Sequence, residues 1–233
     1  MSQNLQTFPA TPATGADLAA TQRNRVLRNT YWLLALSMVP TVLGAWIGVT
    51  TGIAAAMSPG IGLVVFLAGA FGFMYAIEKT KNSSAGVPVL LGFTFFMGLM
   101  LSRLLGQVLG LANGAGLVMT AFAGTGVIFL GMATLSSVIK RDLSAMGKWL
   151  FIGAVMILVA AIANFFLQSS ALMITISVLA IGIFSAFILY DLKRVQDGLE
   201  TNYISATLGV YLSIYNVFQS LLAVFGLTSG RDD

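Results

Sequence analysis

A few polar side chains interrupt the long apolar segments of this sequence, and they are the residues that could do chemistry. Asp191 ends one apolar segment at its boundary with a basic loop, and Arg194 follows one helical turn later. In one interpretation the two residues form an ion pair at the membrane surface, which stabilises a helix by about 0.2–0.5 kcal/mol. In the other, Asp191 senses protons or binds a cation, as ionisable groups inside membranes often do. Both interpretations stay open.

The last apolar segment has two distinct faces at helical spacing. Small and polar residues occupy one face, and we expect it to be buried: Ala206, Gly209, Ser213, Asn216 and Ser220. Aliphatic residues occupy another face, and we expect it to meet lipid: Val210, Ile214, Val217, Leu221 and Val224. The small residues either let helices pack closely or line a polar cavity or ion path. Ser213 and Asn216 are therefore candidates for the same sensing site as Asp191.

Two further charged residues lie at or inside apolar segments and are secondary candidates. Glu78 is followed by Lys81 after one turn, and we interpret this pair as a surface ion pair. Arg103 lies within the third apolar segment, where an arginine at mid-bilayer costs about 2.5–3.5 kcal/mol. It is close to the outer end of that segment, so its long side chain can reach the interface. We expect a structural role for Arg103.

The residue types that are missing exclude several classes of protein. There is no cysteine and no histidine, which removes disulfides, thiolate metal sites, cysteine nucleophiles, HExxH zinc sites and imidazole relays. A glycine-rich phosphate loop is also missing from the sequence. The net charge of +4 comes from residues that flank apolar segments, so it indicates membrane topology rather than nucleic-acid binding. We expect no enzyme activity and no cofactor.

The composition predicts an all-α membrane protein. Of 233 residues 58% are hydrophobic and only 9% are charged, against about 25% charged in soluble domains. A transmembrane helix needs about 20 apolar residues, so the length of the chain predicts a bundle of seven transmembrane helices. We place these spans at residues 30–50, 60–77, 87–111, 117–139, 149–167, 171–190 and 204–226.

Basic residues predict the orientation and the domain organisation. Ten of them lie before the first span or in every second loop: Arg23, Arg25, Arg28, Lys79, Lys81, Lys140, Arg141, Lys148, Lys193 and Arg194. This bias predicts that the N-terminus lies in the cytoplasm and, with an odd number of spans, that the C-terminus lies on the opposite side of the membrane. Residues 1–22 read as a disordered cytoplasmic tail, residues 23–229 as the membrane domain and residues 230–233 as a short C-terminal tail.

Glycine and serine recur every fourth residue on two other spans. The first span carries Gly44, Gly48 and Gly52, and the third carries Gly98, Ser102, Gly106 and Gly110. Small residues at this spacing let two helix backbones approach closely in lipid. The spacing predicts close helix packing along both stripes.

Four short motifs occur in a characteristic order and spacing: Val26–Tyr31, Lys140–Ser144, Glu200–Ile204 and Tyr211–Phe218. Together they resemble the Bax inhibitor family, and most closely its bacterial YccA-like branch. The resemblance extends over nearly the whole chain from about residue 24. It implies a seven-helix fold in which a central helix is wrapped by the others, in the inner membrane of a Gram-negative bacterium.

The resemblance implies two competing functions. YccA-like proteins are substrates and modulators of FtsH, a membrane-anchored AAA protease. Other bacterial members are described as pH-sensitive calcium leak channels gated by two aspartates; Asp191 matches the first, and Ser213 stands at the second position. Two close carboxylates can share a proton, and a carboxylate facing a serine lacks that coupling. We therefore favour FtsH as the partner over Ca²⁺, because residues 1–22 would give the protease a cytoplasmic handle.

Overall fold

The structure is a computed structural model that describes residues 15–230, with the backbone alone for residues 15–18. Within that range the chain forms eight helices and no strand: α1 (Gly15–Thr51), α2 (Ile53–Ala56), α3 (Pro59–Thr80), α4 (Gly86–Leu109), α5 (Gly114–Val138), α6 (Met146–Leu167), α7 (Ser170–Gln196) and α8 (Tyr203–Ser229). Seven of these are long and apolar enough to cross a membrane, and α2 is a single short turn between two of them. The predicted seven-helix membrane bundle is confirmed.

The first helix begins earlier than the sequence predicted. Residues 15–22, which were expected to belong to the disordered tail, form the first turns of α1. Ala19, Ala20, Gln22 and Arg23 have high helix propensity, so the helix extends outward from the membrane segment. The rest of the expected N-terminal tail, residues 1–14, and residues 231–233 of the C-terminal tail lie outside the described part of the chain.

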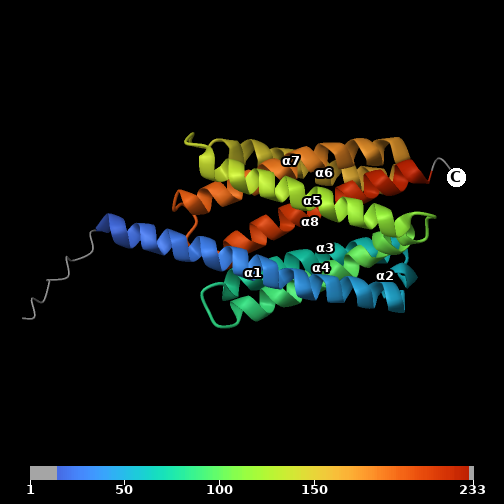
Figure 1. The fold of residues 1–233 in the computed structure, drawn as a ribbon. Coiled ribbons are helices and arrows are strands. Elements are labelled where there is room, and N and C mark those ends of the chain that lie inside the picture. Colours follow the sequence, from blue (N-terminus) through green and yellow to red (C-terminus); the bar gives the residue numbers. More distant parts are fainter. Residues whose placement is uncertain (1–14, 231–233) are drawn as a thin grey trace, which may run out of the picture.

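Helix α8 is the centre of the bundle (Figure 1). It packs against α1, α3, α4, α5 and α7, and it runs between the group α1–α4 and the group α5–α7. The expectation that one face of α8 meets lipid was wrong, because Val210 and Val217 on that face are fully buried. An aliphatic face packs against other helices as readily as against lipid, since lipid tails are as apolar as leucine.

Buried tyrosines connect α8 to the neighbouring helices in the core. The Tyr211 hydroxyl lies 2.9 Å from Oγ1 of Thr41 on α1 and 3.4 Å from the carbonyl oxygen of Thr94 on α4. The Tyr215 hydroxyl donates to the carbonyl oxygen of Met97 at 3.3 Å. These contacts satisfy polar groups that would be costly in an apolar core, and they fix α8 against α1 and α4.

Helices α1 and α4 approach each other closely through their glycines, as the spacing predicted. A Cβ atom added to Gly98 would lie 2.0 Å from the carbonyl oxygen of Thr41, and one added to Gly44 would lie 2.2 Å from that of Phe95. One added to Gly48 would meet the Ser102 side chain at 2.3 Å. Each of these positions therefore requires glycine.

Candidate functional site

The hairpin between α7 and α8 places the candidate site. Helix α7 ends with Gly198 in the left-handed conformation at φ 76°, and the amide of Leu199 donates to the carbonyl oxygen of Arg194 at 2.9 Å. This is a typical glycine-dependent helix end. The chain then reverses, and α8 returns antiparallel beside α7. The reversal brings Asp191 of α7 opposite the first turns of α8.

Asp191 lies against α8 at a glycine. Its Oδ2 atom is 2.9 Å from the position that a Cβ on Gly209 would occupy, so the carboxylate is in contact with the α8 backbone. Ser213 follows Gly209 by one helical turn, and its hydroxyl donates to the Gly209 carbonyl oxygen at 3.0 Å. Asp191 thus touches α8 one helical turn before Ser213.

Asn216 is one turn further along α8 and is also held by its own helix. Its Nδ2 atom donates to the carbonyl oxygen of Leu212 at 2.8 Å. Ser213 and Asn216 therefore direct hydrogen bonds to the α8 backbone. Such bonds to the preceding turn satisfy polar side chains inside a membrane helix.

Arg194 pairs with a different carboxylate from the one that its spacing suggested. Its guanidinium lies 3.8 Å from Oε2 of Glu200, and it also stacks over the Tyr190 ring, 5.7 Å from the centroid. Among the described residues, no hydrogen bond or ion pair involves the Asp191 carboxylate. Asp191 therefore lies at the α7–α8 contact, near the charges of Arg194 and Glu200, without the ion pair expected from its spacing.

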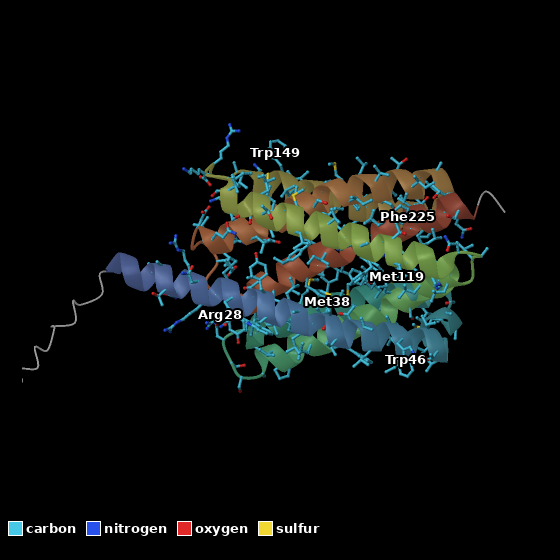
Figure 2. The ribbon with its side chains drawn as sticks, viewed as in Figure 1. Arg28, Met38, Trp46, Met119, Trp149 and Phe225 are labelled. Carbon is cyan, nitrogen blue, oxygen red and sulfur yellow. The ribbon has the colours of Figure 1, made fainter. Side chains whose placement is uncertain are left out.

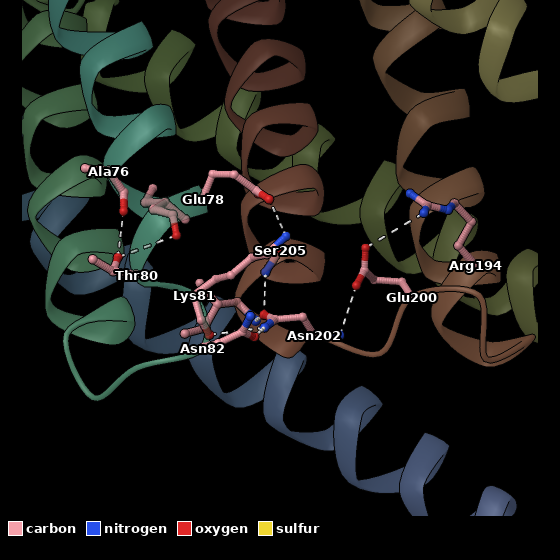
Figure 3. Close-up of polar contacts among 11 residues, drawn as sticks. Ala76, Glu78, Thr80, Lys81, Asn82, Arg194, Glu200, Asn202 and Ser205 are labelled. Carbon is pink, nitrogen blue, oxygen red and sulfur yellow. Dashed lines mark hydrogen bonds and ion pairs between the residues drawn. The ribbon is translucent and has the colours of Figure 1, made fainter.

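The polar residues around the start of α8 form a second cluster that the sequence did not single out (Figure 3). The Asn202 side chain accepts from the amides of Ile204 at 2.9 Å and of Ser205 at 3.1 Å, which caps α8. Its Nδ2 atom donates to the Lys81 carbonyl oxygen at 3.1 Å and to Oδ1 of Asn82 at 2.9 Å. The detectable signal was an asparagine immediately before a helical segment, a preferred capping position.

Glu78 and Arg103 have contacts of their own, and neither contact involves Asp191. Glu78 is exposed at the end of α3 and pairs with Lys81, as the spacing predicted. Arg103 donates to the carbonyl oxygen of Met57, in the connection between α2 and α3, at 3.4 Å. The arginine thus satisfies a backbone carbonyl that follows the short helix α2, which is a structural contact.

Two more contacts order the loops at the same end of the bundle. The Gln196 side chain of α7 donates to the Ser136 hydroxyl of α5 at 2.9 Å. In the loop between α5 and α6, the backbone amide and the hydroxyl of Ser144 both donate to Asp142. These hydrogen bonds lower the pKa of the Asp142 carboxyl below its usual value.

The described part of the chain holds no group of three or more His, Cys, Asp or Glu side chains that could bind a metal ion. Asp191 supplies one carboxylate, and Ser213 supplies a weak neutral ligand. Calcium sites use six to eight oxygen ligands, several of them carboxylates. The arrangement can hold a proton, or interact weakly with a cation.

Comparison with known proteins agrees with the fold and the motifs. A family model described as inhibitor of apoptosis-promoting Bax1 matches residues 23–230. The chain belongs to this Bax inhibitor family. The match begins at Arg23, inside α1, and extends past the end of α8, so it covers most of α1 and all of the helices that follow.

Bacterial members of the Bax inhibitor family are similar over most of their length. A protein of Neisseria meningitidis is 39% identical over 90% of this chain and 94% of its own length. A membrane protein of Vibrio cholerae is 37% identical over 91% of this chain and 93% of its own. A protein of Escherichia coli K12 named modulator of FtsH protease YccA is 36% identical over 88% of this chain and 91% of its own.

Proposed function

We propose that this chain is an inner-membrane substrate and modulator of an FtsH-type AAA protease. The observation that carries the proposal is its 36% identity, over 88% of the chain, to the E. coli protein named modulator of FtsH protease YccA. A second relative, from another E. coli strain, is named inner membrane protein YccA. In this role the chain is a protease partner and has no enzyme activity of its own.

The geometry of α1 supports a mechanism for the proposal. Its 37 residues correspond to about 55 Å of helix at 1.5 Å per residue, whereas the apolar core of a bilayer is about 30 Å thick. The helix therefore projects beyond the bundle at its N-terminal end (Figure 1). The residues before α1 are the handle that we propose for the protease.

The charges support the orientation that this mechanism needs. The basic residues at the start of α1, at the end of α3 and at the end of α7 lie at the same end of the bundle. An excess of positive charge on one side favours a cytoplasmic location for that side. A protease that begins at residues 1–14 would then pull against a packed seven-helix bundle, stay occupied, and act more slowly on other membrane proteins.

Co-purification with the protease tests the proposal. A proteolytically inactive FtsH should retain the full-length chain during purification. It should not retain a variant lacking residues 2–14, because that variant has lost the proposed handle although α1 itself is unchanged. A third variant, with residues 2–14 replaced by a Gly-Ser segment of equal length, separates a generic handle from a specific sequence. Equal retention of the full-length and deleted chains would remove the role proposed for residues 1–14.

A second candidate function, a cation leak, is favoured by one observation. The Asp191 carboxylate lies against α8 without an ion-pair partner among the described residues. In liposomes a leak predicts calcium flux that falls on Asp191→Asn and persists on Glu78→Gln, an exposed carboxylate that already has a lysine partner. Ser213→Asp would restore a second carboxylate and should make the flux depend on pH. No flux at any pH in the unmodified chain or in Ser213→Asp would dispose of this candidate.

A further inference from the structure

An open groove with a volume of about 470 Å³ runs along one face of α1. The residues that line it recur every three or four positions, so they share one side of the helix. They are Asn24, Leu27, Arg28, Tyr31, Trp32 and Ala35. From the first to the last, the groove covers about 16 Å along the helix axis.

The character of the groove changes along its length. Asn24 and Arg28 form its polar end and are exposed. Trp32 is 73% exposed, and Tyr31 is half-buried, with its ring edge-on to Phe129 of α5 at 6.3 Å between centroids. Beyond the rings the helix becomes apolar. Polar groups, then aromatic rings, then apolar surface is the order met when entering a bilayer from water.

The charge that α1 itself carries around the groove has one sign. Arg23, Arg25 and Arg28 lie within two turns of each other, and no Asp or Glu occurs between residues 19 and 51. The ion pairs of the described residues involve none of these arginines. A guanidinium without a carboxylate partner is free to bind a phosphate through two hydrogen bonds.

We propose that this groove binds one anionic phospholipid. The phosphate accepts hydrogen bonds from Arg28 and Asn24, the rings of Tyr31 and Trp32 lie at the glycerol level, and the acyl chains follow the apolar continuation of the helix. The charge favours a lipid over the transmembrane helix of a second protein, because an unpaired arginine at the membrane boundary matches a headgroup phosphate. This inference is independent of the protease.

Quenching of Trp32 by brominated lipid tests the proposal. In a variant with Trp46→Phe and Trp149→Phe, the fluorescence comes from Trp32 alone, since the chain has three tryptophans. The protein is placed in nanodiscs with equal fractions of brominated phosphatidylglycerol or brominated phosphatidylcholine. We expect about a fivefold preference for the anionic lipid, the enrichment that one basic side chain gives near an anionic surface. Arg28→Gln should abolish this preference.

Matched controls separate a site from general attraction to positive charge. Arg25→Gln removes the same charge from outside the groove and should keep the preference. Trp149 is 70% exposed, follows Lys148, and lies across the bundle from Arg28 (Figure 2). In a variant with Trp32→Phe and Trp46→Phe, the fluorescence comes from Trp149 alone, and both lipids should quench it equally. Three outcomes would overturn the proposal. They are equal quenching of Trp32 by both lipids, equal effects of the two arginine variants on the lipid preference, and the same preference for the anionic lipid at Trp149. Failure of both lipids to quench Trp32 would also overturn it, since protein would then cover the groove.

Discussion

At the scale of single residues, Asp191 was identifiable from the sequence, but its surroundings were not. A lone carboxylate at the edge of an apolar segment is conspicuous by composition. Its expected partner, Arg194, instead pairs with Glu200, because the loop after α7 folds back toward the helix end. Spacing within a helix indicates which side chains of that helix can contact each other. It does not indicate that a carboxylate from the following loop, here Glu200, can pair with the same arginine.

The contact between Asp191 and Gly209 should be sensitive to a single methyl group. In Gly209→Ala the new Cβ would lie 2.9 Å from Oδ2 of Asp191, so either the Asp191 carboxylate or the two helices must shift, at a cost of up to about 1–3 kcal/mol. In Gly182→Ala, on α7, nothing lies within 4 Å of the new atom, and we expect no loss of stability. Thermal unfolding in detergent compares the two variants. Equal melting temperatures would show that the contact is not as close as described.

The loop carboxylate Asp142 should titrate below its usual range. Hydrogen bonds from Ser144 lower its pKa in the folded chain, so its contribution to loop stability is complete above the unfolded pKa of about 3.9 and is lost as pH falls through the folded pKa. The carboxyl chemical shift of Asp142 and the amide shift of Ser144 should therefore change together, at a pH below that of a model peptide. In Asp142→Asn the change at Ser144 should vanish. A midpoint at or above the peptide value would contradict the assignment.

At the scale of helices, the spacing of small residues correctly predicted the α1–α4 contact, whereas the spacing of aliphatic residues on α8 led to a wrong prediction of lipid exposure. Gly44, Gly48, Gly98 and Ser102 lie at the α1–α4 contact because close backbone approach depends only on small size. Gly52 belongs to the same stripe, yet it has φ 67° and caps α2. The aliphatic face of α8 was assigned to lipid and is buried, because periodicity does not distinguish lipid from a neighbouring helix.

The α1–α4 contact should depend on Gly98 and not on Gly106 of the same helix. A Cβ on Gly98 would overlap the Thr41 carbonyl oxygen at 2.0 Å, whereas one on Gly106 meets nothing within 4 Å. Gly98→Ala should therefore lower the free energy of unfolding by about 1–3 kcal/mol, and Gly106→Ala should leave it unchanged or raise it slightly. Unfolding in a denaturing detergent measures both. A neutral Gly98→Ala would contradict the close approach of the two backbones.

The start of α8 should depend on Asn202. Asn202→Ala removes the helix cap and both hydrogen bonds to the loop between α3 and α4, with an expected loss of about 0.5–2 kcal/mol from the cap alone. Asn82→Ala removes only one of these bonds and serves as the control. Hydrogen exchange should accelerate in the first turn of α8 in the first variant and stay slow there in the second. Similar exchange in both would argue against a capping role.

At the scale of the whole molecule, hydropathy was sufficient to predict the number of spans, and the orientation drawn from the basic residues stays a prediction. The family resemblance implied a central helix without indicating which span it is, and the structure shows that it is α8. Composition could not single out α8, because it resembles that of the other spans. The length of α1 was underestimated, because the polar residues before Val26 have no apolar period. Their helix propensity nevertheless continues the helix outward to Gly15.

The central claim is that this chain occupies an FtsH-type protease through the residues before α1. The most direct measurement is the rate at which FtsH degrades a second membrane substrate in proteoliposomes, with increasing amounts of this chain. The full-length chain should slow that degradation, and the variant lacking residues 2–14 should not, although both contain the same bundle. If both slow it equally, or neither does, the account of this chain as a modulator acting through its N-terminal residues is wrong.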